Sequence, residues 1–138
     1  MYNHIMVPVD LGHTKTLGRA LETAADLAKH YGAKVTYVGV TSSAPGSVAH
    51  SPEEYQTKLG EFAKTQADAH TVETAAHSAI SHDPSVDLDP TLLKAADEIG
   101  ADLIVMQSHI PGLADHLWPS NGGKIARQAK CSVMVVRD

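Results

Sequence analysis

The sequence predicts an α/β fold: a single, doubly wound, five-stranded parallel sheet of order 3-2-1-4-5 with helices on both faces. Short apolar runs rich in branched residues alternate with segments of helical periodicity along the chain. Such runs are typical of strands buried on both faces of a sheet. Two of them joined through a helix are parallel neighbours, because a parallel pair needs a long crossover, and right-handed crossovers leave few possible orders.

The composition is typical of one globular domain spanning residues 1–138. Hydrophobic residues make up 43% and charged residues 20% of the 138-residue chain. The net charge of −5 argues against nucleic acid or an anionic membrane as a partner. The single cysteine excludes an internal disulfide, the N-terminus lacks a signal-peptide pattern, and no apolar run approaches the about 20 residues that span a bilayer. We therefore expect a cytoplasmic protein.

The first strand covers residues 4–10, and its near-uniform apolar character predicts a central position. Pro8 cannot donate a ladder hydrogen bond, so we expect it near the end of that strand. A helix follows, for which Thr14 or Thr16 is the expected N-cap. Gly32 suits the left-handed position that ends this helix.

The second strand covers residues 34–40 and leads into a loop of small and polar residues, 41–50. Residues 51–54 are Ser-Pro-Glu-Glu, which combines an N-cap, a proline at the first helical position and a capping-box glutamate. The helix they begin is expected to end near His70. Its apolar face is thin, so we expect it to pack only partly against the sheet.

The third strand, residues 72–80, has a weak pattern that fits an edge position. A loop over residues 81–88 is expected next, and Asp89 with Pro90 is expected to start the following helix. The fourth and fifth strands cover residues 101–106 and 131–136. A loop and a short helix starting at residue 122 connect them.

Ligands of such sheets bind beyond the carboxyl ends of the strands, where the strand order reverses. The first and fourth strands form this switch point, so Asp10 is expected to face residues 107–109 across a crevice. A phosphate site needs N–H groups converging at a helix N-terminus, and Ser120 and Asn121 stand before the last helix. These two residues would alternatively act only as helix caps.

The chain resembles the universal stress protein family over nearly its whole length. The resemblance is carried by the first strand ending in Pro8-Val9-Asp10, the strand 101–106, the closing strand 131–137, and the segments 108–111 (Ser-His-Ile-Pro) and 117–121 (Leu-Trp-Pro-Ser-Asn). The last two segments are most similar to small single-domain bacterial members of the Ser-His-x-Pro type. No single motif is decisive, but their order and spacing together are specific.

The glycine motif of the nucleotide-binding members is degenerate in this chain. Gln107 and Ile110 stand where that family has Gly-x-x-Gly, and Pro119-Ser120 replaces the later Gly-Ser pair at a shorter spacing than the long pattern requires. Pro119 lacks the N–H that a glycine would offer a phosphate. Gly122 and Gly123 partly restore backbone freedom one turn later.

The resemblance implies an adenine nucleotide (ATP, ADP or AMP, with or without Mg²⁺) as the ligand. It implies that Asp10 accepts a hydrogen bond from a ribose hydroxyl and that the main chain of Val40 binds the adenine edge. The predicted nucleotide-binding residues are Pro8, Val9, Asp10, Val40, Gln107, Ser108, His109, Ser120 and Asn121.

No catalytic residue and no metal site are predicted. Ser108, His109 and Asp10 lack the Gly-x-Ser-x-Gly elbow of a nucleophile, so His109 is expected to orient the loop or contact a phosphate. The nine histidines show no pair at ligand spacing on one helix; His77, His82 and Asp83 form the only local group. We therefore expect a binding protein, not an enzyme.

The last strand is an apolar sheet edge, and Val133 to Val136 is expected to pair with a second copy in a homodimer, as the resemblance also implies. The leading hypothesis is a nucleotide-responsive stress-response module with a protein partner that the sequence does not identify. A scaffold of the same fold that binds no nucleotide is the alternative. A slow nucleotide hydrolase is the third reading.

Overall fold

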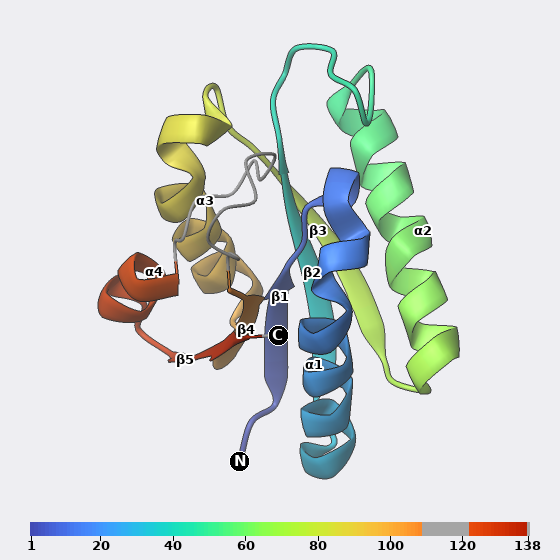
Figure 1. The fold of residues 1–138 in the computed structure, drawn as a ribbon, viewed down its shortest axis with the longest axis vertical. Helices are drawn as coiled ribbons and strands as arrows, with labels where there is room; N and C mark the ends of the chain where they lie inside the picture. The colour runs from blue at the N-terminus through green and yellow to red at the C-terminus, as the bar shows by residue number, and fades with distance from the viewer. Residues whose placement is uncertain (109–121, 138) are drawn as a thin grey trace.

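Five parallel strands form one sheet in the order β3-β2-β1-β4-β5, which confirms the predicted fold class (Figure 1). The computed structural model describes residues 1–108 and 122–137. The elements are β1 (His4–Pro8), the 3₁₀ segment η1 (Leu11–Leu17), α1 (Gly18–Tyr31), β2 (Lys34–Thr41), α2 (Pro52–His70), β3 (Thr74–Ile80), α3 (Pro84–Ile99), β4 (Leu103–Gln107), α4 (Gly122–Gln128) and β5 (Ser132–Val136).

The central strand β1 is held between β2 and β4 along its length. Its five residues pair in register with β2, and its residues Ile5 and Met6 pair with β4. The Asp102 carboxylate accepts hydrogen bonds from the N–H groups of Asn3 (2.8 Å) and His4 (3.1 Å). The Asp102 side chain, just before β4, therefore fixes the start of β1 beside β4. The two strands are parallel, so their carboxyl ends lie at the same edge of the sheet.

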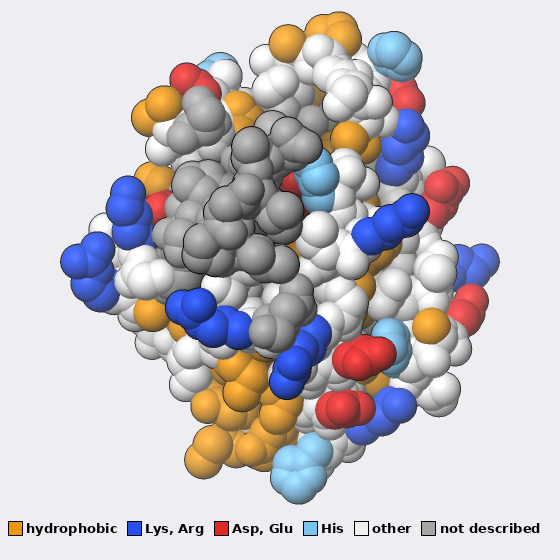
Figure 2. Space-filling model, in the orientation of Figure 1, with side chains coloured by type: hydrophobic (Ala, Val, Ile, Leu, Met, Phe, Trp, Pro, Cys, Tyr) orange, Lys and Arg blue, Asp and Glu red, His pale blue; other side chains and the backbone are white. Residues whose placement is uncertain are grey.

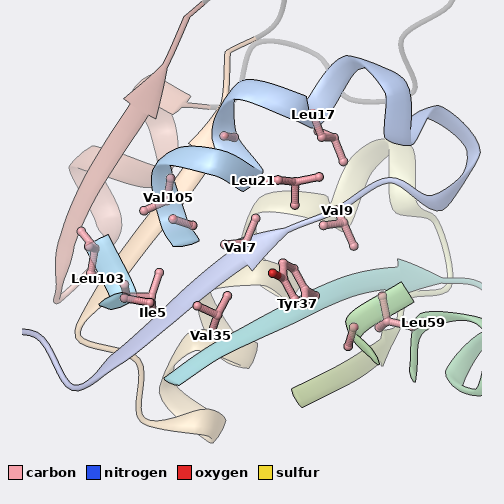
Figure 3. Packing of buried hydrophobic residues seen from close by; sticks show 14 of the residues in the cluster. Ile5, Val7, Val9, Leu17, Leu21, Val35, Tyr37, Leu59, Leu103 and Val105 are labelled. Carbon is pink, nitrogen blue, oxygen red and sulfur yellow. The ribbon is translucent and has the colours of Figure 1, made fainter. Parts of the chain in front are cut away.

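Each face of the sheet has its own apolar core. Helices α1 and α2 cover one face, over Val7, Val9 and Tyr37, and α3 and α4 cover the other, over Met6, Val38 and Ile104. Figure 3 shows the first core, in which Leu21 of α1 lies over β1 and Leu59 of α2 lies beside Tyr37. No helix in the described parts of the chain has the length and apolar character needed to cross a bilayer.

Tyr37 is the largest fully buried side chain of the described core. Its ring meets Phe62 edge to face, with centroids 5.3 Å apart. Its hydroxyl oxygen is buried without a hydrogen-bond partner in the described structure, and burial raises the pKa of Tyr37 to about 12. This phenol therefore contributes packing, while its hydroxyl is unsatisfied.

Two predicted helix ends are confirmed and one predicted cap is wrong. Gly32 has φ 66° at the end of α1, and the Ser51 side chain accepts from the Glu54 N–H at 3.1 Å. Neither Thr14 nor Thr16 caps α1; the Thr16 hydroxyl instead donates to the His13 carbonyl oxygen. The chain leaves β1 as a 3₁₀ segment interrupted by the non-helical backbone of His13, so regular helix begins only at Gly18.

Helix α3 begins earlier than predicted. It starts at Pro84, not at Asp89 and Pro90, and Pro90 lies inside it. The carbonyl of Asp83 accepts from the N–H groups of Val86 and Asp87. These bonds form the first turn, so Pro84 is the first helical residue. The first of two available prolines occupies the favoured early position, and the second is tolerated inside the helix on an exposed face.

Replacing Pro90 with alanine is expected to stabilise the fold by about 1–3 kcal/mol, because an internal proline removes one helical hydrogen bond and clashes with the preceding turn. Urea unfolding of Pro90→Ala against the parent chain measures this. An unchanged or lower stability would mean that the conformation imposed by Pro90 is needed for α3 to pack on the sheet.

Candidate functional site

A cavity of about 350 Å³ lies beyond the carboxyl ends of β1 and β2. Its walls come from the segment after β1, the end of β2, the 41–50 loop, the start of α2 and the start of α3. The lining residues that bear on its chemistry are Asp10, Val40, Val48, Tyr55, Asp83 and Leu88. The cavity lies at the carboxyl edge of the sheet, where parallel sheets bind ligands, but it lies beside β1 and β2 and not at the predicted switch point between β1 and β4.

Asp10 is held in a fixed orientation by the chain that follows it. Its Oδ1 accepts from the Gly12 N–H at 3.0 Å, and its Oδ2 lies 2.9 Å from His13 Nδ1. The carboxylate side chain is 15% exposed and the imidazole 31% exposed, so the pair sits at the rim of the cavity. A carboxylate has about four lone-pair sites, so Asp10 retains acceptor capacity for a ligand hydroxyl.

The main chain of Val40 points into the space that β1 leaves empty. The Val38 carbonyl accepts from the Val9 N–H at 2.8 Å, so Val38 faces β1, whereas the Thr41 carbonyl accepts from Ser81 beyond β3. Alternate residues of a parallel strand face the same neighbour, so the N–H and C=O of Val40 also face the β1 side. The last residue of β1 in the ladder is Pro8, which pairs with Val38, so the ladder stops before Val40. One donor and one acceptor therefore stand side by side at the cavity.

Tyr55 of α2 packs against β2 at Gly39, the residue before Val40. It is 5% exposed, and its ring occupies the space where Gly39 has no side chain: a Cβ at Gly39 would be 2.3 Å from the Tyr55 hydroxyl oxygen. Burial raises the pKa of Tyr55, and the negative charge of Asp10 raises it further. The phenol therefore stays protonated near neutral pH and can donate a hydrogen bond.

The 41–50 loop is tied to α2 and forms the outer wall of the cavity. The Gly46 N–H donates to the Ala49 carbonyl at 2.9 Å, and Lys58 of α2 donates to the Val48 carbonyl. Glu54 accepts from the His50 N–H at 3.0 Å, so its partner is the residue before the N-cap, whereas the predicted capping box would use the Ser51 N–H. The first turns of α2, through Glu54 and Lys58, thus also hold the 41–50 loop at the cavity.

The predicted site residues divide into four groups, the last of which is Gln107 with Ser108. Asp10 and Val40 line the cavity. Pro8 and Val9 end β1 beside it, but the Val9 side chain is buried in the core, which leaves its backbone as the part near the site. His109, Ser120 and Asn121 lie outside the described residues.

Gln107 and Ser108 lie at the end of β4 and make contacts within the fold. The Gln107 carboxamide oxygen accepts from the Ala20 N–H at 3.1 Å, which ties β4 to the first turn of α1. The Ser108 N–H donates to the Val136 carbonyl at 2.7 Å, which extends the pairing of β4 with β5. Neither residue lines the cavity over β2.

The described lining is acidic. It contains the carboxylates of Asp10 and Asp83 and, among its described residues, no lysine or arginine. Within the described ranges no cluster of three or more histidine, cysteine or acidic residues has the geometry of a metal site. His77, considered above with His82 and Asp83, instead pairs with Glu98 of α3 at 3.3 Å. The described lining therefore offers carboxylate and main-chain groups for hydrogen bonding.

Sequence reasoning missed Tyr55, Gly39 and the 41–50 wall. One signal was available: Gly39 is the only glycine in the second predicted strand, and a strand glycine often marks a close approach of another group. The pattern does not say which group approaches, because Tyr55 belongs to a different element.

The fold and the cavity together define a doubly wound α/β protein with a cavity at the carboxyl edge of its sheet. The chain belongs to the universal stress protein family, whose family model matches residues 1–137. Universal stress protein G of Shigella flexneri is 27% identical over 151 residues, covering 99% of this chain and 100% of that protein.

Solved structures share the fold. A universal stress protein in complex with cAMP superposes with a TM-score of 0.71 at 20% identity, covering 98% of this chain and 97% of that one. The Archaeoglobus fulgidus universal stress protein in complex with dAMP superposes with a TM-score of 0.64 at 23% identity, covering 97% of each chain.

Proposed function

We propose that this protein binds an adenine nucleotide in the cavity between Asp10 and Val40 and acts as a nucleotide-responsive module. The observation that carries the proposal is the main chain of Val40, whose paired donor and acceptor point into a cavity that also holds the Asp10 carboxylate. An adenine edge offers a matching acceptor and donor, and a ribose hydroxyl matches a carboxylate acceptor. A volume of about 350 Å³ is within the range of small-molecule pockets.

Two further points support the proposal. Members of the family have been solved with cAMP and with dAMP, which are both adenine nucleotides. The described lining offers hydrogen-bonding groups for a base and a sugar but contains no water-activating base beside a metal cluster. Binding is therefore the proposed activity, and nucleotide occupancy would change the surface that a partner protein contacts.

Denaturing the natively purified protein and identifying the released small molecules by mass spectrometry tests the proposal. We expect a stoichiometric adenine nucleotide, and we expect calorimetric titration of the emptied protein to show saturable binding of ATP, ADP or AMP, with and without Mg²⁺. Replacing Ser120 and Asn121 with alanine is expected to weaken binding of the phosphate-bearing ligands. No released nucleotide and no titration would instead support the scaffold that acts through protein contacts alone.

We also propose a homodimer formed through β5. Met134 and Val135 on this edge strand are 41% and 38% exposed, and Figure 2 shows hydrophobic side chains gathered at the end of the molecule where β5 and the N-terminus lie. An apolar, uncovered edge favours pairing with another chain.

The other edge of the sheet is protected. Gln56 of α2 donates to the Ala76 carbonyl at 3.3 Å and accepts from the Ser78 N–H at 3.0 Å, so its carboxamide occupies the outer backbone groups of β3 as a neighbouring strand would. This contrast between the two edges favours β5 as the dimer interface.

Placing a charge on the β5 edge is expected to convert the dimer to a monomer. Val135→Lys opposes two positive charges across a two-fold interface, and sedimentation or light scattering measures the mass. Val86→Lys is the matched control, because Val86 is 72% exposed on α3 and away from both edges. Gln56→Ala should produce larger assemblies by freeing β3. A monomeric parent chain, or an unchanged dimer in Val135→Lys, would contradict the interface.

A further inference from the structure

The Tyr55 hydroxyl is placed inside the cavity by a close fit between two elements. A Cβ at Gly39 would lie 2.3 Å from the Tyr55 hydroxyl oxygen and 2.8 to 2.9 Å from two ring carbons, which real structures do not tolerate. The absence of a side chain on β2 therefore leaves the space that the phenol fills. Because Gly39 precedes Val40, the hydroxyl lies next to the main-chain groups proposed to bind the base.

The same hydroxyl lies within the electrostatic influence of Asp10. The carboxylate contributes to raising the pKa of Tyr55, after burial, so the phenol keeps its proton. Asp10 is an acceptor only, whereas a protonated phenol both donates and accepts. The cavity thus offers a ligand both a hydrogen-bond acceptor, the Asp10 carboxylate, and a hydrogen-bond donor, the Tyr55 hydroxyl.

Tyr37 shows what a purely structural tyrosine looks like in this fold. Tyr37 lies on the face of β2 that α1 and α2 cover, in the same core as Tyr55. Its ring packs against Phe62, and its hydroxyl is buried without a partner among the described residues. Tyr55 differs because it lines the cavity. Packing alone accounts for the ring of Tyr55, but it does not account for a hydroxyl held at the cavity wall by a glycine.

We propose that Tyr55 is a specificity-determining residue whose hydroxyl hydrogen-bonds the nucleoside part of the ligand, its base or sugar. The inference rests on the proposed function and names the part of the ligand that this end of the site selects. The position of the hydroxyl supports the nucleoside part, because it lies next to the Val40 main chain and in the same cavity as Asp10, the groups proposed to bind the base and the ribose.

Calorimetric titration of Tyr55→Phe with adenosine, AMP and ATP tests the assignment. The variant keeps the ring and removes only the hydroxyl, so we expect affinity to fall about 5- to 20-fold for each of the three ligands, as for one lost hydrogen bond in a desolvated site. Tyr37→Phe is the matched control: it removes a hydroxyl from the same layer and should leave all three affinities unchanged.

Adenosine analogues identify the ligand group that meets the hydroxyl. The analogues lack the 2′-hydroxyl, the 3′-hydroxyl or one base nitrogen. The analogue that lacks the group bound by the Tyr55 hydroxyl should bind the parent chain and Tyr55→Phe with equal affinity. A merely structural role for Tyr55 would lower affinity for every analogue by the same factor, together with the melting temperature of the unliganded protein. That pattern would overturn the inference.

The other outcomes separate the two proposals. Parent-like affinities in Tyr55→Phe would overturn the role of Tyr55 and leave nucleotide binding intact. A loss confined to AMP and ATP would also overturn it, by placing the hydroxyl at the phosphates. A parent chain that binds none of the three ligands would overturn the proposed function itself.

Discussion

Replacing Asp10 with asparagine is expected to weaken adenine nucleotide binding by about 10- to 100-fold. The proposed contact is a hydrogen bond from a ribose hydroxyl to a carboxylate, and hydrogen bonds to charged groups contribute about 1.5–3 kcal/mol. The asparagine carbonyl can still accept from the Gly12 N–H, which the Asp10 carboxylate now binds at 3.0 Å. The 3₁₀ segment after β1 should therefore be retained, and the unfolding free energy should change by less than about 1 kcal/mol.

Titration calorimetry and urea unfolding of Asp10→Asn measure the two quantities separately. Asp26→Asn makes the same chemical change at an exposed position of α1 and serves as the control for net charge. Equal nucleotide affinity in Asp10→Asn and the parent chain would exclude Asp10 from the site. A loss of stability as large as the loss of binding would mean that Asp10 acts by holding the backbone of η1.

Replacing Gly39 with alanine is expected to destabilise the protein by about 1–3 kcal/mol, the usual cost of overpacking a core. The new Cβ would displace the ring of Tyr55, which is 5% exposed and has little room to move. The sign is the informative part, because alanine inside a strand is otherwise about 0.5–1 kcal/mol more favourable than glycine. Nucleotide affinity should fall as well, since the hydroxyl would leave the floor of the cavity.

Gly60→Ala is the matched control for this substitution. Gly60 lies inside α2, and a Cβ there would have no neighbour within 4 Å. Alanine should stabilise that helix by up to about 1 kcal/mol. Urea unfolding of both variants gives the comparison; a stable Gly39→Ala protein with unchanged affinity would show that Tyr55 moves without consequence.

Local sequence signals predicted well wherever a single residue determined its own backbone. Gly32 adopts the left-handed conformation because glycine lacks a Cβ, and the Ser51 side chain caps α2 by accepting from the Glu54 N–H. Prediction was wrong at Pro90, where two prolines each offered a helix start. The choice between Pro84 and Pro90 depended on where the carbonyl of Asp83 could close the first turn.

The candidate site was predictable only along the strands that carry it. Asp10 follows from the strand order, because the carboxyl ends of parallel strands share one edge, whereas Val40 came from the family resemblance. Gln107 beside the ligand stays a prediction; the structure adds that its carboxamide oxygen accepts from the Ala20 N–H in the first turn of α1. A side chain's hydrogen-bond partner on another element is not contained in its own local pattern.

By itself the sequence determined the order of strands and helices and the parallel sheet, because hydrophobic periodicity and crossover handedness act through neighbours along the chain. The family was recognised separately, from the resemblance of particular segments, and the family model confirms it. Only the tertiary structure decided that Tyr55 fills the gap above Gly39 and that Gln56 covers the β3 edge. Both contacts join α2 to the sheet, and they depend on how the thin apolar face of that helix settles against β2 and β3. That rotation is set by packing across the whole layer, so no pattern within either segment encodes it.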